Sequence, residues 1–158
     1  MDFSKLETKI NIKFQNIELL QIALTHRSYL NENRAYQLSH NERLEFLGDA
    51  VLELVTTEYL YRNFPNPEGD LTNLRSALVN YRLLAAVAKE IGIEDYILLS
   101  RGEAKDTGRA RQVILANALE ALIGAIYLDQ DTAVAKQFIE NFVLGKLPEI
   151  MRDQAYLD

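Results

Sequence analysis

Acidic side chains occur inside two stretches of this sequence that are otherwise apolar. In the first stretch, Glu45 and Asp49 lie four residues apart, and Glu42 lies three residues before Glu45. On an α-helix these spacings place all three carboxylates on one face. In the second stretch, Asn117 and Glu120 lie three residues apart and share a face in the same way. Such oxygen donors are the ligands that Mg²⁺ and Mn²⁺ prefer, with the remaining positions left for water and phosphate oxygens.

Two alternatives to a metal site stay open for these carboxylates. They could form ion pairs with Arg or Lys, or they could form an acidic stripe that faces water. Burial of an unpaired carboxylate costs on the order of several kcal/mol, so a buried acid needs a positive partner. The apolar surroundings of Glu45, Asp49 and Glu120 therefore favour a divalent cation over a solvated stripe.

The segments that carry these acids read as core helices. Eight of the twelve residues in 44–55 are apolar, which is typical of a buried helix. In 113–128 the only polar groups are Asn117, Glu120 and the Tyr127 hydroxyl. That stretch is too short and too interrupted for a membrane span of roughly 20 residues, so we expect a central core helix and no membrane partner.

The rest of the chain favours an all-α fold. No proline occurs between Pro67 and Pro148, and no segment alternates cleanly between apolar and polar residues. We expect roughly seven to eight helices, with Asp70 as an N-cap, a break near Asn80 and Gly92 as a helix stop. The predicted helices begin near residues 4 and 16 and cover about 40–63, 70–91, 109–129 and 132–144, with loops at 31–39, 63–69 and 101–108. We expect one domain over 1–150 and a C-terminal tail over 151–158.

Composition narrows the class of protein. The 158 residues include no cysteine, which excludes disulfide scaffolds and thiolate chemistry, and the N-terminus lacks the pattern of a signal peptide. We therefore expect a cytoplasmic protein. The formal charge of −6 argues against nucleic acid at first sight, but residues 41–70 alone hold seven acids and two bases, a net of −5. The acidity is thus concentrated where the first half of the metal site is expected.

Residues 41–52, NERLEFLGDAVL, closely resemble the signature of the ribonuclease III family. Residues 24–29, 68–75 and 115–129 resemble further parts of the same family in the expected order. The resemblance implies a homodimeric all-α nuclease domain that cleaves double-stranded RNA during RNA processing. It implies hydrolysis that depends on Mg²⁺, with Mn²⁺ as a substitute, and that needs no organic cofactor. The implied products carry 5′-phosphate and 3′-hydroxyl ends with short 3′ overhangs.

The resemblance also implies roles for individual residues. The catalytic set carried onto this chain is Glu45, Asp49 and Glu120, and Asn117 joins these three as a metal ligand. Glu42 and Glu68 match further acids of the family near the cleft. Phe46 matches a residue that projects into the partner subunit, although an ordinary core aromatic is an equal alternative from the sequence alone.

Two features depart from the family pattern. Position 117 is usually Asp and is Asn here, which still offers an oxygen ligand but removes a charge. Bacterial members usually continue into a double-stranded-RNA-binding domain, which this chain does not include. Because of Asn117, a catalytically impaired or inactive member that binds RNA or serves as a structural subunit is the alternative function. A di-iron protein is disfavoured, because neither His26 nor His40 follows a Glu by three residues.

A basic segment precedes the Asn117 helix. Residues 101–111 hold four basic and two acidic side chains. We hypothesise that Lys105, Arg109 and Arg111 contact the RNA backbone, and the alternative is a solvated mobile loop.

Overall fold

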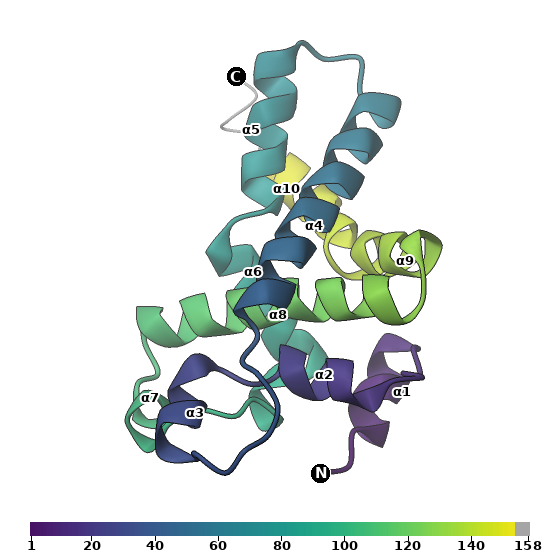
Figure 1. The fold of residues 1–158 in the computed structure, drawn as a ribbon. Helices are drawn as coiled ribbons and strands as arrows, with labels where there is room; N and C mark the ends of the chain where they lie inside the picture. Colours follow the sequence, from purple (N-terminus) through teal and green to yellow (C-terminus); the bar gives the residue numbers. More distant parts are fainter. Residues whose placement is uncertain (154–158) are drawn as a thin grey trace.

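The computed structural model describes residues 1–153, and this part of the chain is helical without a β-strand, which confirms the all-α prediction (Figure 1). The only strand-like pairing within these residues is an isolated bridge between Thr25 and Leu98. The α-helices are α1 Ser4–Ile10, α2 Ile17–Ala23, α3 Arg27–Glu32, α4 Glu42–Asn63, α5 Glu68–Leu78, α6 Tyr81–Ile91, α7 Arg101–Lys105, α8 Arg109–Asp129, α9 Thr132–Phe142 and α10 Leu147–Asp153, with short 3₁₀ turns at Ile93–Asp95 (η1) and Leu144–Lys146 (η2).

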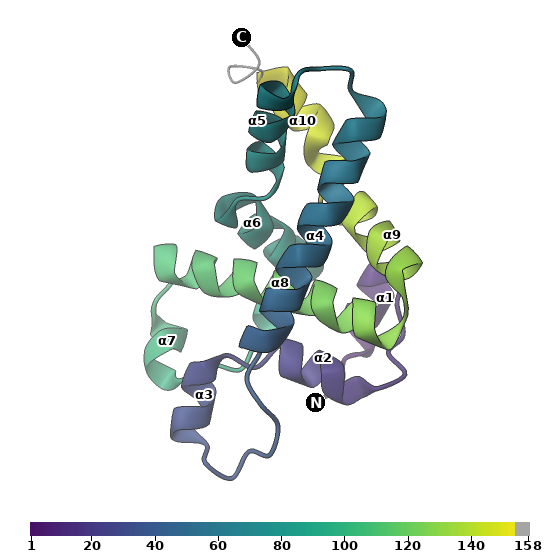
Figure 2. The ribbon, with the colours of Figure 1, turned by 45° about the horizontal axis from the view of Figure 1, so that its top comes forward.

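Helix α8 is the centre of the fold. Figures 1 and 2 show α4 crossing α8, and α4 and α6 are the helices that pack most extensively against it. By length and composition α8 is long and apolar enough to cross a membrane, but 61% of its apolar stretch is buried inside the fold. A core helix of a soluble protein passes the same test, and the predicted core position is confirmed.

Most predicted helix ends agree with the structure. The Asn80 side chain accepts a hydrogen bond from the Leu83 N–H, which caps α6 at the predicted break. Gly92 ends α6 with φ of 91°, a left-handed conformation that favours glycine. Asn16 likewise accepts from the Glu18 N–H at the start of α2.

Two predicted boundaries were wrong. Asp70 is not an N-cap: α5 begins at Glu68 after Pro67, and Asp70 lies in its first turn. The predicted loop 101–108 contains helix α7, because the Ser100 side chain caps it by accepting from the Glu103 N–H. Helices of one or two turns such as this one carry too little apolar periodicity to be recognised in a sequence.

The predicted tail is only partly described. Residues 151–153 complete α10, so regular structure continues past the expected domain boundary at 150. The rest of the predicted tail, residues 154–158, lies outside the described residues.

The first turn of α4 is fixed by contacts with the last residue of α2 and the segment that follows it. Asn41, which is 3% exposed, donates from its side chain to the Ala23 carbonyl and from its backbone to the Thr25 carbonyl, each at 3.0 Å. The Glu45 N–H then donates to the Asn41 carbonyl. Because Asn41 is buried and doubly bonded, it fixes the position at which the acidic face of α4 begins.

Candidate metal-binding active site

The crossing of α4 and α8 forms an acidic pocket. Its volume is about 570 Å³, and its lining consists of the two predicted groups of acidic and amide side chains together with one aromatic ring: Glu42, Glu45, Phe46, Asp49, Asn117 and Glu120. Residues more than 60 positions apart in the chain thus meet in one pocket. The structure brings together all four side chains predicted as metal ligands.

Burial and neighbouring carboxyl groups favour the protonated forms of two acids in the acidic pocket. Burial, a hydrogen bond with Asp49 and the charges of Asp49 and Glu45 raise the pKa of Glu120 to about 9, against an ordinary value of 4.5. Burial and the neighbouring charges of Glu42 and Asp49 also raise the pKa of Glu45. Two carboxylates that share a site in this way hold a proton between them near neutral pH unless a cation replaces it.

The protein itself supplies little positive charge to these groups. Within residues 1–153, the ion pairs include none to Glu45, Asp49 or Glu120, whereas Glu42 lies 3.2 Å from Arg27. The ion-pair alternative therefore fits Glu42 alone. The solvated-stripe alternative does not fit Glu120, because burial is the largest cause of its raised pKa.

The donor set fits a hard divalent cation. Over the described part of the chain, no group of three or more His, Asp or Glu side chains has the geometry of a metal-binding cluster. The acidic pocket instead offers carboxylate oxygens and one amide oxygen on an open wall, which suits Mg²⁺, an ion that binds few protein ligands and retains several waters. A cation would also offset the repulsion that raises the pKa of Glu120.

Glu68 does not join the acidic pocket within one chain. It lines a separate cavity of about 200 Å³ between α4 and α5, together with residues that include Tyr61 and Arg75. Within a single copy of the chain, Glu68 therefore does not lie with the other predicted acids in the acidic pocket.

Phe46 is not a core aromatic. It is 83% exposed, although it follows Glu45 directly and lines the acidic pocket. Leu54 and Tyr61, on the same side of α4, are 65% and 78% exposed. An apolar stripe of this kind on a helix surface is typical of a protein interface.

The predicted RNA-contact residues fall into two groups. Arg111 is mostly buried: its guanidinium lies 3.1 Å from the Glu94 carboxylate and donates to the Ala104 carbonyl at 2.9 Å. It fastens α7 to the start of α8. Lys105 and Arg109 are exposed, and the Arg109 guanidinium lies over the Tyr81 ring at 5.4 Å.

Sequence reasoning missed the partner of Arg111 and the partner of Glu42. Glu94 precedes Arg111 by 17 residues and Arg27 precedes Glu42 by 15. Neither separation follows a helical or strand period, so only the tertiary fold brings these pairs together.

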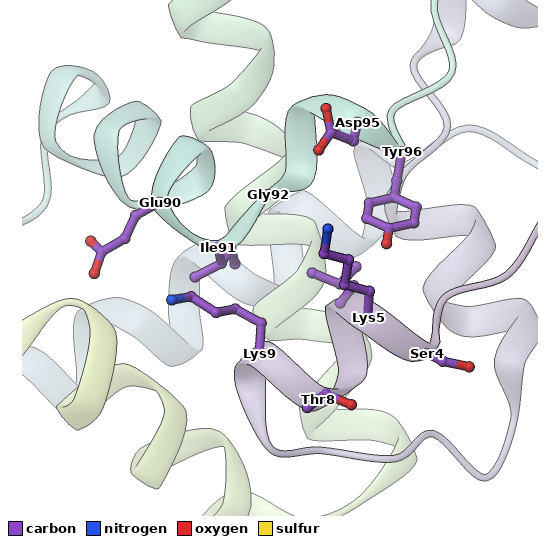
Figure 3. A pocket seen from close by; sticks show the side chains of 10 residues that line it. Ser4, Lys5, Thr8, Lys9, Glu90, Ile91, Gly92, Asp95 and Tyr96 are labelled. Carbon is purple, nitrogen blue, oxygen red and sulfur yellow. The ribbon is translucent and has the colours of Figure 1, made fainter.

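A second cavity of comparable size, about 560 Å³, lies between α1 and the end of α6 (Figure 3). The Lys5 and Lys9 side chains extend from α1 toward the segment that contains Ile91 and Tyr96. None of the residues predicted as metal ligands lines this second cavity.

Comparisons with known proteins agree with this geometry. The family model described as "Ribonuclease-III-like" matches residues 16–147. Ribonuclease 3 of Enterococcus faecalis is 49% identical, and the alignment covers 91% of this chain and 63% of that protein. Ribonuclease 3 of Clostridium tetani is 47% identical, and the alignment covers 100% of this chain and 67% of that protein. The chain thus spans about two thirds of the length of these relatives.

Solved structures give the same result. The nuclease domain of ribonuclease III from Campylobacter jejuni, described with structural flexibility in a region involved in dimer formation, is similar with a TM-score of 0.83 and 41% identity, over 93% of this chain and 99% of that one. Dicer from Pichia stipitis is similar with a TM-score of 0.68 and 28% identity, over 91% of this chain and 61% of that one. By sequence and by fold, this chain belongs to the ribonuclease III family.

Proposed function

We propose that this chain is the nuclease domain of a metal-dependent endoribonuclease that hydrolyses phosphodiesters in double-stranded RNA. The observation that carries the proposal is the meeting of Glu45, Asp49, Asn117 and Glu120 in one acidic pocket with little compensating charge from the protein. The expected products carry 5′-phosphate and 3′-hydroxyl ends with short 3′ overhangs.

Each side chain has a defined task in this proposal. Glu45, Asp49 and Glu120 bind and orient Mg²⁺ through carboxylate oxygens, and Asn117 adds a neutral amide oxygen. When bound, Mg²⁺ supplies a Lewis acid that lowers the pKa of water and offsets negative charge at the phosphorus and the leaving oxygen. Glu120 must release its proton to act as a ligand, which it does more readily as the cation approaches.

RNA would reach the acidic pocket from the side of α7 and the first turn of α8. Lys105 and Arg109 are exposed there and are available to phosphates, whereas Arg111 is held by Glu94. Contacts of this kind carry no sequence information, in keeping with a substrate recognised by its duplex shape.

We further propose that the domain works as a homodimer through the exposed stripe on α4. Phe46 and Tyr61 lie near opposite ends of this stripe, and Leu54 lies close to its midpoint. If two copies pair about a two-fold axis near Leu54, Phe46 of one copy meets the Tyr61 end of the other. The cavity between α4 and α5 lies at that end, so Glu68 of a second copy comes close to Glu45 only in the dimer.

A cleavage assay tests the nuclease proposal. We expect duplex RNA to be cut in the presence of Mg²⁺ or Mn²⁺, and Asp49→Asn to abolish cleavage while helical circular dichroism is unchanged. Asn117→Asp is the second variant, because it restores the charge that is usual in the family. If neither this chain nor Asn117→Asp cuts duplex RNA with either metal, the alternative of an inactive RNA-binding or structural member is favoured.

A further inference from the structure

Two glycines form the contact between α4 and α8. A Cβ atom placed on Gly48 would overlap the Glu120 carbonyl oxygen and lie 2.9 Å from the Gly124 nitrogen. A Cβ atom placed on Gly124 would overlap the Leu44 carbonyl oxygen and lie 3.2 Å from the Gly48 nitrogen. The two backbones therefore touch directly, with no side chain between them at this point.

The glycine contact lies beside the proposed metal ligands. Gly48 precedes Asp49 and touches the backbone of Glu120 itself, while Gly124 touches the residue before Glu45. The distance between the two helices at this contact thus decides how far the Asp49 and Glu45 carboxylates lie from Glu120.

We propose that Gly48 and Gly124 are positioning residues that set the spacing of the carboxylates on α4 relative to Glu120, and thereby the affinity for the divalent cation. This inference rests on the proposed metal site. The distance between packed helix axes varies over about 8–10 Å with the side chains at the contact, so an added methyl group separates the helices by an amount on the order of 1 Å. Mg²⁺ and Mn²⁺ need oxygen ligands held to within roughly 0.5 Å, which leaves no room for such a shift.

The test measures Mn²⁺ binding by calorimetry, without RNA and at 4 °C. We expect Gly124→Ala to keep its helical circular dichroism and to weaken Mn²⁺ binding by roughly tenfold or more, the size of effect typical of residues that orient metal ligands. Gly69→Ala is the matched control, because Gly69 lies in α5 and a Cβ there meets nothing within 4 Å. It should bind Mn²⁺ as the unaltered chain does.

A second control separates positioning from stability. Leu78 is fully buried in α5, so Leu78→Ala should lower the melting temperature without moving the glycine contact. We expect its Mn²⁺ affinity to be unchanged. Equal loss of affinity in Leu78→Ala and Gly124→Ala, or failure of Gly124→Ala to fold even at 4 °C, would assign the glycines a general folding role and overturn the proposal.

Lengthening one ligand side chain tests the positioning role directly, because a purely structural role of the glycines would not change the direction of its effect on Mn²⁺ affinity. Asp49→Glu adds one methylene of reach, so it should weaken Mn²⁺ binding in the unaltered chain and strengthen it in Gly124→Ala. The same sign in both backgrounds would contradict the inference. If the unaltered chain binds no Mn²⁺ at all, the proposed metal site is wrong and this inference falls with it; normal binding by Gly124→Ala overturns the positioning role alone.

Discussion

Glu120 on α8 and Asp49 on α4 line the same acidic pocket, and the neighbouring Asp49 carboxyl adds to the burial that raises the pKa of Glu120 to about 9. With a pKa of about 9, Glu120 holds a proton at neutral pH when no cation is bound. The acidic pocket therefore contains a proton in the position where the proposed function needs a cation. Exchange of this proton for a divalent cation makes metal binding and the free energy of unfolding depend on pH.

The first prediction concerns the pH dependence of stability without metal. The pKa of Glu120 is about 9 in the folded chain and near 4.5 when unfolded, so between these values the folded state holds a proton that the unfolded chain has released. The free energy of unfolding should therefore fall as pH rises from about 5 to about 8 in the presence of a chelator.

Glu120→Gln is the matched control for this prediction, because it preserves shape and cannot titrate. Urea unfolding of both proteins across this range should give a flatter profile for the variant. Other groups, including His26, are common to both proteins, so the difference between the profiles isolates Glu120. Identical slopes would contradict the raised pKa. Saturating Mg²⁺ should reverse the slope of the unaltered chain, since the cation binds the deprotonated form.

The second prediction separates the two kinds of basic residue near α7. Arg111→Ala removes a mostly buried guanidinium and leaves Glu94 without its partner, so it should lower the free energy of unfolding by about 1–3 kcal/mol. Arg109→Ala, at an exposed position, should change it by less than about 0.5 kcal/mol. Chemical denaturation of both variants decides the matter.

For affinity to duplex RNA, substitutions of the exposed basic residues should have a larger effect than substitution of Arg111. Lys105→Ala combined with Arg109→Ala should weaken binding to duplex RNA and reduce its dependence on salt, because two phosphate contacts are lost. A titration at several salt concentrations that shows no change in affinity or slope would remove these residues from the RNA interface.

The third prediction concerns association of two copies. Leu54→Arg places a charge at the centre of the exposed stripe on α4 and should convert a dimer into a monomer, as measured by light scattering. Leu128→Arg is the control, since Leu128 is 53% exposed on α8, outside that stripe. Loss of the dimer in both variants would point to general instability, and a monomeric unaltered chain at micromolar concentration would count against the interface.

The fourth prediction uses two buried threonines. Thr56 and Thr25 are both 0% exposed, but the Thr56 hydroxyl has no hydrogen-bond partner within residues 1–153, whereas Thr25 donates to the Gln21 carbonyl at 2.7 Å. Thr56→Val should therefore raise the free energy of unfolding by about 1 kcal/mol, and Thr25→Val should lower it by about 1–2 kcal/mol. Equal effects of the two substitutions in urea unfolding would refute this assignment.

Local signals in the sequence predicted more of this structure than long-range contacts did. Asn80 and Gly92 mark helix ends through their own side-chain and backbone chemistry, and the spacing of Glu45 and Asp49 fixes a shared helix face. The meeting of that face with Glu120 was expected from the family resemblance and from the cost of buried charge. Within one stretch, 101–111, the sequence could not distinguish Arg111 from Arg109, because their difference depends on Glu94, which is distant in the chain.

Phe46 shows a different limit. An aromatic residue in an apolar helix is equally compatible with a core and with an interface, because both bury the ring and differ only in the chain that covers it. The exposure of 83% removes the core alternative, and no pattern in a single sequence carries that information.

The position of the acidic pocket on α4 and α8 determines how the proposed metal site would be lost on heating. These helices form the innermost contact of the fold, so their amide hydrogens should be among the slowest to exchange with solvent. Fraying of α1, α7 or other peripheral segments leaves the proposed ligands in place. Heat inactivation of the metal site should therefore coincide with global unfolding, unlike that of enzymes whose ligands lie on mobile loops.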